Sequence, residues 1–146
     1  MSRILALDVG EKRIGVAVSD ELHMLARPLK TIIHSDLAGD VSALTALLTQ
    51  YAVETLVVGF PRSLSGEEGP QALRVKRYAR GLATALPVPI VLWDERYSTV
   101  QAVEYLAEAG RRRRDARGDK GQIDAAAAAV ILQDYLDAQR PPTSSG

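Results

Sequence analysis

The sequence predicts an α/β fold in which a five-stranded mixed β-sheet has helices packed on its faces. Two observations lead to this prediction. Three strand-like segments come first, separated by short turns, which is typical of an antiparallel meander. Two further apolar runs follow, each after a segment with helical spacing, which is typical of crossover connections between parallel strands. The first three strands are therefore expected to be antiparallel.

The opening meander is expected to occupy three segments. A short apolar run that ends at a turn signal predicts the first strand over residues 3–9. Residues 13–19 form the next apolar run and return antiparallel. The third segment, residues 25–33, contains Pro28, which cannot donate a hydrogen bond to a neighbouring strand. This strand is therefore expected at an edge of the sheet.

The remainder of the chain alternates between helical and strand patterns. Buried strands are expected over residues 55–60 and 90–93. Helices are expected over residues 37–51, 68–86, 98–110 and 122–138. The last of these is apolar on nearly every face over residues 123–132, so we expect it to be largely buried.

Composition excludes several classes of protein. The sequence has no cysteine, which excludes disulfide scaffolds, thiolate metal sites and cysteine nucleophiles. With 18 basic and 18 acidic residues the net charge is zero, so any case for nucleic-acid binding depends on local patches. No apolar run approaches the roughly 20 residues that span a membrane. We expect a cytoplasmic protein with one domain over residues 1–140 and a disordered tail over residues 141–146.

Three carboxylates are candidates for chemistry because of their positions. Asp8 ends one apolar strand, Glu95 follows another, and Asp124 lies at the start of a buried helix. If the fold brings them together, their like charges raise one another's pKa or recruit a cation. Oxygen ligands of this kind suit Mg²⁺ or Mn²⁺. Two such ions roughly 4 Å apart would support hydrolysis of a phosphodiester bond.

Each carboxylate also has a purely structural interpretation. Asp8 could cap the turn that follows its strand. Asp124, in the first turn of its expected helix, could complement the helix dipole. Glu95 could form an ordinary surface ion pair with Arg13 or Arg96. The sequence pattern leaves these alternatives open.

Two further features of the sequence stay ambiguous. Asp94 and Glu95 are consecutive, and consecutive strand residues point to opposite faces, so at most one of them faces the site. His23 and His34 both lie in loop-like segments. Neither histidine has a partner at a spacing that indicates a metal site or a general base.

A basic segment precedes the last helix. Residues 111–121 contain six Arg and Lys residues against two Asp, beginning with the run Arg111, Arg112, Arg113 and Arg114 and ending near Lys120. With the basic face of the helix over residues 68–86, this segment could follow a phosphate backbone. Alternatively, it is a solvated loop with no binding role.

The first strand also allows a rival fold. Asp-x-Gly followed by a glycine-containing return strand occurs in sugar-kinase and actin-like ATPases, where backbone donors in the turn hold nucleotide phosphates. Those proteins need two such domains around the nucleotide, and this chain has room for one. It also lacks a second phosphate loop.

Five segments, in order, carry a resemblance that covers nearly the whole chain. They are Asp8–Gly10 with Lys12–Val18, Arg27–Leu29, Val58–Pro61 with Gly66, Asp94–Thr99, and Ile123–Ala125 with Ala128–Leu132. Together they resemble the YqgF family of RNase H-like nucleases, whose members are labelled Holliday-junction resolvases or pre-16S rRNA nucleases. The resemblance implies an RNase H-like fold.

The resemblance also implies roles for individual residues. Asp8, Glu95 and Asp124 would be the catalytic, metal-binding carboxylates, which favours Glu95 over Asp94. The family's basic positions fall here on Arg13, Arg96 and Lys120, which would contact the phosphates of the nucleic acid.

We therefore expect a nuclease that depends on Mg²⁺ or Mn²⁺, with two metal ions at its site. The expected substrate is RNA, in processing of the 5′ end of pre-16S rRNA during ribosome biogenesis. The alternative is branched DNA, cut by a Holliday-junction resolvase that acts as a dimer. A second alternative is a non-catalytic RNA-binding factor in ribosome assembly. The sequence does not decide between a monomer and a homodimer.

Overall fold

A computed structural model describes residues 2–60, 69–94 and 120–139 of the chain. Its elements are β1 (Arg3–Val9), β2 (Arg13–Ser19), β3 (Ala26–Ile33), α1 (Leu37–Gln50), β4 (Val53–Phe60), α2 (Pro70–Ala85), β5 (Ile90–Asp94) and α4 (Lys120–Gln139). These bounds agree closely with the predicted ones. The predicted helix over residues 98–110 and the predicted tail lie outside the described residues.

The five strands form one mixed sheet in the order β3-β2-β1-β4-β5. Antiparallel pairing joins β1 to β2 and β2 to β3. Parallel pairing joins β1 to β4 and β4 to β5. The predicted mixed sheet with an antiparallel opening meander is therefore confirmed. The carboxyl ends of β1, β4 and β5 meet at the same edge, where open α/β sheets place their functional groups.

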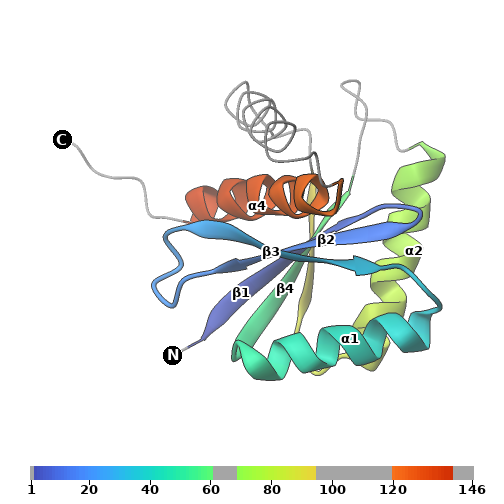
Figure 1. Ribbon diagram of the computed structural model, residues 1–146, viewed down its shortest axis with the longest axis horizontal. Helices are drawn as coiled ribbons and strands as arrows, with labels where there is room; N and C mark the ends of the chain where they lie inside the picture. The colour runs from blue at the N-terminus through green and yellow to red at the C-terminus, as the bar shows by residue number, and fades with distance from the viewer. Residues whose placement is uncertain (1, 61–68, 95–119, 140–146) are drawn as a thin grey trace.

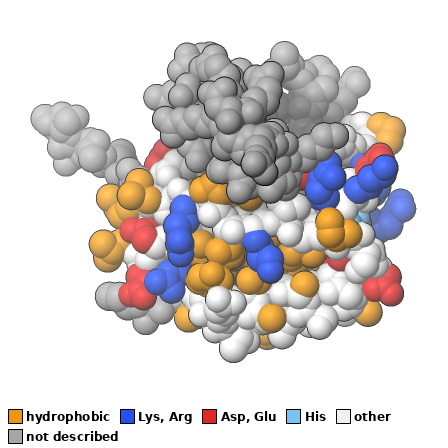
Figure 2. Space-filling model, in the orientation of Figure 1, with side chains coloured by type: hydrophobic (Ala, Val, Ile, Leu, Met, Phe, Trp, Pro, Cys, Tyr) orange, Lys and Arg blue, Asp and Glu red, His pale blue; other side chains and the backbone are white. Residues whose placement is uncertain are grey.

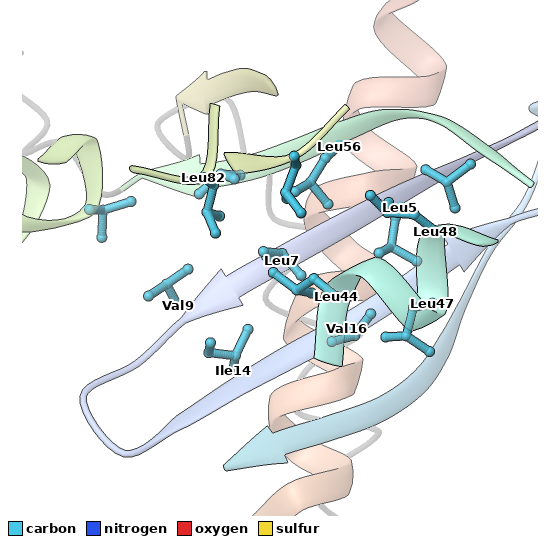
Figure 3. Close-up of a cluster of buried hydrophobic side chains, with 14 of the residues drawn as sticks. Leu5, Leu7, Val9, Ile14, Val16, Leu44, Leu47, Leu48, Leu56 and Leu82 are labelled. Carbon is cyan, nitrogen blue, oxygen red and sulfur yellow. The ribbon is translucent and has the colours of Figure 1, made fainter. Parts of the chain in front are cut away.

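Helices cover both faces of the sheet (Figure 1). The helices α1 and α2 pack on one face, where the larger apolar cluster lies (Figure 3). The helices contribute Leu44, Leu47, Leu48 and Leu82 to this cluster. The strands contribute Leu5, Leu7, Val9, Ile14, Val16 and Leu56. The side chain of Asp36 begins α1 by accepting the Gly39 N–H at 2.8 Å.

The helix α4 covers the other face (Figure 1). Small side chains, among them Ala128 and Ala129, let it pack closely against β1, β2 and β4 through Ala6, Ala17 and Val57. This packing confirms that the helix is largely buried where its sequence is apolar. No helix in the described ranges combines the length and the apolarity that a membrane crossing requires.

The strand β3 lies at an edge of the sheet, as its proline predicts. Pro28 sits where the register between β2 and β3 shifts, so its missing N–H falls at an irregular point of the ladder. Arg27 and Lys30 are exposed, and Ile33, at the end of the strand, is 71% exposed.

A buried carboxylate connects β3, α1 and α2. Asp40 in the first turn of α1 is only 1% exposed. It accepts the Ser35 N–H at 3.0 Å and the Tyr78 hydroxyl at 2.7 Å, and Nδ1 of His34 lies against its Oδ2 atom. Burial raises the pKa of Asp40, but the hydrogen bonds from Ser35 and Tyr78, together with His34, outweigh it and hold the pKa below its usual range. Asp40 is therefore ionised in the folded protein.

We expect Tyr78→Phe to lower the free energy of unfolding by about 1–2 kcal/mol at neutral pH, because it removes a donor from a buried carboxylate. A carboxyl whose pKa is lowered by folding stabilises the protein above its ordinary value of 3.8. The loss should therefore be full at neutral pH and shrink as the pH falls below about 4. Urea denaturation across this pH range measures it.

Tyr51→Phe is the matched control, because Tyr51 packs on the same core and its hydroxyl has no hydrogen-bond partner among the described residues. Its effect should stay within about 0.5 kcal/mol. Equal losses in the two variants would contradict a specific role for the Asp40 contact.

Candidate functional site

Asp8 lies near the carboxyl end of β1, on the face of the sheet that α4 covers. Alternate residues of a strand point to the same face, and Ile4 and Ala6 of this strand pack against α4. The antiparallel register places Asp8 opposite Gly15 of β2. Because Gly15 has no side chain, the residue of β2 directly opposite Asp8 places no side chain beside the Asp8 carboxylate.

Gly15 allows the closest approach between α4 and the sheet. A Cβ atom at this position would overlap the backbone carbonyl of Asp124. The helix therefore rests directly on the backbone of β2 at this point. This contact brings Asp124 to the side of Asp8, although the two residues are far apart in the sequence.

The electrostatics of the pair follow from this placement. Burial, and then the negative charge of Asp124, raise the pKa of Asp8 to about 6. Asp8 has no hydrogen-bond partner in the part of the chain that the structure describes. Asp124 is better supported, because Nε of Arg13 donates to its Oδ2 atom at 2.9 Å. The site thus holds two interacting carboxylates and one arginine that offsets part of their charge.

The structural interpretations of these two carboxylates are weakened. The turn after β1 is closed by the backbone, since the Gly10 N–H donates to the Arg13 carbonyl at 2.9 Å, and it needs no cap from Asp8. The prediction that Asp124 lies in the first turn of its helix was wrong. The helix α4 begins at Lys120 and has no acidic residue in its first turn, so the helix dipole does not explain Asp124.

Asp94 does not join the pair. It pairs in register with Phe60, whose side chain belongs to the cluster under α1 and α2. Trp93, its neighbour, packs on the face that α4 covers, as the alternation of a strand requires. Asp94 therefore lies on the opposite face from Asp8.

Most other predicted site residues lie outside the described residues. These are Glu95, Arg96, Arg111, Arg112, Arg113 and Arg114. Lys120 is the first residue of α4, and its side chain is not described. Within the described ranges no group of three or more His, Asp or Glu residues could hold a metal ion, so the predicted third carboxylate, Glu95, stays a prediction.

The structure also reveals a contact that the sequence analysis missed. The sequence shows no spacing that indicates a metal site or a general base at His34, and the contact between its Nδ1 atom and Asp40 was not predicted. The signal was present in the spacing of α1, because Asp40 lies four residues before Leu44 on the buried face of the helix. A carboxylate on an apolar face requires polar partners, and His34 is one of them.

Comparison with known proteins assigns the chain to a family. A family model described as RuvX, Holliday junction resolvase, matches residues 2–138. The chain belongs to the RuvX family. The predicted membership of a nuclease family is thereby confirmed, and the protein is a hydrolase that acts on ester bonds.

Relatives and solved structures agree with RuvX membership. Proteins named "Putative pre-16S rRNA nuclease" from Syntrophus aciditrophicus and Moorella thermoacetica are 46% and 48% identical, over 93% and 92% of this chain and 89% and 94% of theirs. The structure of T. thermophilus RuvC in complex with a Holliday junction substrate matches with a TM-score of 0.57 at 18% identity, covering 95% of this chain and 97% of that one. Fowlpox virus resolvase with substrate Holliday junction DNA matches with a TM-score of 0.57 at 11% identity, covering 95% and 99%. These two likenesses confirm the RNase H-like fold.

We expect Asp8→Asn to stabilise the protein in metal-free buffer, because it removes a carboxylate that folding makes harder to ionise. A carboxyl whose pKa is raised by folding costs stability once the pH rises through its folded value of about 6. The variant should gain about 1–3 kcal/mol near pH 8. The gain should decrease as the pH falls and vanish below the ordinary value of 3.8. Denaturation with chelator at several pH values tests this, and a gain that does not depend on pH would contradict it.

We expect Gly15→Ala to displace the start of α4 and to lower the free energy of unfolding by about 1–3 kcal/mol, because the new methyl group meets backbone atoms. Gly69→Ala is the control, since nothing lies within 4 Å of a Cβ atom at that position. Thermal denaturation compares the two. A Gly15→Ala protein as stable as the control would show that α4 does not rest on β2 at this point.

Proposed function

We propose that this protein acts in the cytoplasm as a divalent-metal-dependent nuclease that processes the 5′ end of pre-16S rRNA. The observation that carries the proposal is the meeting of Asp8 and Asp124 over Gly15. A pair of like charges on otherwise apolar elements, with the pKa of one raised to about 6, costs stability and has no structural purpose of its own. Strongly shifted pKa values of this kind are typical of functional sites.

The residues present fit a divalent cation. Asp8 and Asp124 offer hard carboxylate oxygens side by side, and a cation between them would relieve their repulsion. With Glu95 as the proposed third ligand, these side chains would hold Mg²⁺ or Mn²⁺, with two ions in the complete site. Ions of this kind supply an activated water and neutralise charge on the phosphate and the leaving oxygen.

The arginine and lysine side chains would bind and orient the substrate. Among the described residues Arg13 donates only through Nε, to Asp124, and its other four guanidinium N–H groups would bind a phosphate. Arg96 and Lys120 would hold the same strand near the site. The run Arg111, Arg112, Arg113 and Arg114 would follow its backbone.

The names of the relatives support RNA as the substrate, because proteins 42–48% identical over most of their length are named for pre-16S rRNA. A second candidate is branched DNA, which is supported by the family description and by the two junction complexes of the same fold. A symmetric cut at a four-way junction needs two sites, so this alternative requires a homodimer, whereas RNA processing does not.

The deciding experiment compares two labelled substrates under the same conditions. One is an RNA with the pre-16S 5′ extension, and the other is a synthetic four-way DNA junction. Each is incubated with Mg²⁺, with Mn²⁺ and with chelator. We expect metal-dependent cleavage of the RNA, reduced at least about 10³-fold in Asp8→Asn, Glu95→Gln and Asp124→Asn, since each loses a ligand to the reacting centre.

Asp137→Asn is the control, because it removes a carboxylate from the exposed end of the same helix as Asp124. It should cleave as fast as the unmodified protein. Symmetric nicking of the junction without RNA cleavage would favour the resolvase. Tight RNA binding without cleavage of either substrate would contradict the nuclease and indicate a non-catalytic assembly factor.

A further inference from the structure

We propose that His34 and Arg74 form a second phosphate-binding site, which takes a phosphodiester of the nucleic-acid strand away from the bond that is cut. The proposal rests on the proposed function, because it assumes a nucleic-acid substrate. It concerns a different face of the sheet and different residues from the carboxylate site. Nothing in the roles of Asp8 and Asp124 requires it.

The site is a recess of about 270 Å³ beyond the carboxyl end of β1. Its walls include Val9 and Glu11 from the end of β1 and the turn, His34 after β3, and Arg74 and Tyr78 from α2. Val9 packs on the face that α1 and α2 cover, and Asp8 points to the opposite face. The recess and the carboxylate pair therefore flank the same end of β1 from its two sides. A nucleic-acid strand that runs across the carboxyl end of β1 therefore passes both the recess and the carboxylate pair.

His34 is held so that one ring nitrogen is left for a ligand. Its Nδ1 atom is buried against the Asp40 carboxylate, and its backbone N–H donates to the Lys12 carbonyl at 2.9 Å. The Tyr78 ring meets the imidazole edge to face at 5.2 Å. Nε2 has no partner among the described residues. In the cationic form of the ring this atom donates to an anion.

Arg74 supplies the stronger phosphate donor. Its only partner in the described ranges is Glu11, at 3.1 Å, and the side chains are 50% and 73% exposed. An exposed pair of this kind contributes about 0–1 kcal/mol, so a phosphate can replace Glu11 at little cost. A guanidinium also binds a phosphate in the bidentate manner that gives short, strong hydrogen bonds.

Cationic side chains continue past the recess. This arrangement favours a nucleic-acid strand, and not a single small anion, as the ligand. Arg74 and Tyr78 also line a neighbouring shallow recess of about 240 Å³, whose wall includes Arg77 one turn further along α2. Figure 2 shows charged side chains gathered at this end of the molecule. Among the described residues, negative charge beside the recess comes from Glu11, which pairs with Arg74, and from the buried Asp40, which lies against His34.

The test measures the binding of a fluorescein-labelled single-stranded RNA by anisotropy over a range of salt concentrations. Asp8→Asn is the starting protein, so that the probe is not cut. Adding Arg74→Gln should weaken binding about three- to tenfold and reduce the salt slope by about 0.7, the value of one lost phosphate contact on a single strand. His34→Gln should weaken binding in the same direction. Adding Glu11→Gln should instead strengthen binding about threefold, because Arg74 is released.

A variant that combines Glu11→Gln with Arg74→Gln distinguishes a local binding site from a general effect of net charge. If Glu11 acts through Arg74, its removal has no effect once Arg74→Gln is present. Arg3 and Glu21 form the control, an ion pair at 3.3 Å whose side chains are 30% and 44% exposed, at the opposite end of the strands. Glu21→Gln and Arg3→Gln should change RNA binding little. Arg74→Gln, Glu11→Gln and Glu21→Gln alter exposed charges, so their thermal midpoints should stay within a few degrees of the starting protein. His34→Gln also removes a contact to the buried Asp40, so a lower midpoint is expected for this variant.

Three results would overturn the proposal. One is an effect of Glu11→Gln that persists in full beside Arg74→Gln. Another is an equal effect of the control pair. The third is displacement of the RNA by millimolar inorganic phosphate, which would indicate a site for the free anion. Failure of the proposed function looks different, because metal-dependent cleavage would then be absent from the unmodified protein while the pattern of RNA binding remained.

Discussion

The contact of α4 with the bare backbone of β2 at Gly15 is the constraint on which the candidate site depends. A helix that rests on a sheet through ordinary side chains is held away from the sheet backbone by those side chains. Because Gly15 has no side chain, α4 comes closer to β2 at this position, which places Asp124 beside Asp8. The repulsion between these two carboxylates then has to be tolerated, and Arg13 offsets only part of it. The close packing of small residues such as Ala128 and Ala129 below this point holds the helix in place.

The strand β1 presents different residues to the two faces of the sheet. Its even-numbered residues face α4 and end at Asp8, and its odd-numbered residues face α1 and α2 and end at Val9. Polar groups gather beyond the end of the strand on both sides, the carboxylates on one and His34 with Arg74 on the other. A short alternating strand thus places two chemically different surfaces on the two sides of its carboxyl end.

Local patterns predicted most of the fold, because burial of a strand or of a helix face is visible in the spacing of apolar residues. Pro28 marked the edge strand, and the apolar run before Asp8 marked β1. The start of α4 was placed two residues late, because Gly121 disfavours a helix and the preceding residues are polar. The packing of α4 on the sheet outweighs that local preference.

Contacts between distant segments could not be derived from the sequence pattern. The meeting of Asp8 with Asp124 depends on where a helix crosses a sheet, and only the family resemblance indicated it. The contact between His34 and Asp40 joins the end of a strand to the first turn of a helix, across a turn that gives no periodic signal. Asp40 on the buried face of α1 was the available indication that a partner had to exist.

The edge strand β3 limits how two copies of this chain can associate. An exposed edge normally offers a row of N–H and C=O groups on which a second chain can extend the sheet. On β3 this edge carries the exposed cations Arg27 and Lys30, and its register with β2 is irregular beside Pro28. Two identical β3 edges of this kind carry like charges and repel each other. A dimer that cut both arms of a junction would therefore not pair β3 with β3, and would form through the other edge strand, β5, or through helices or loops.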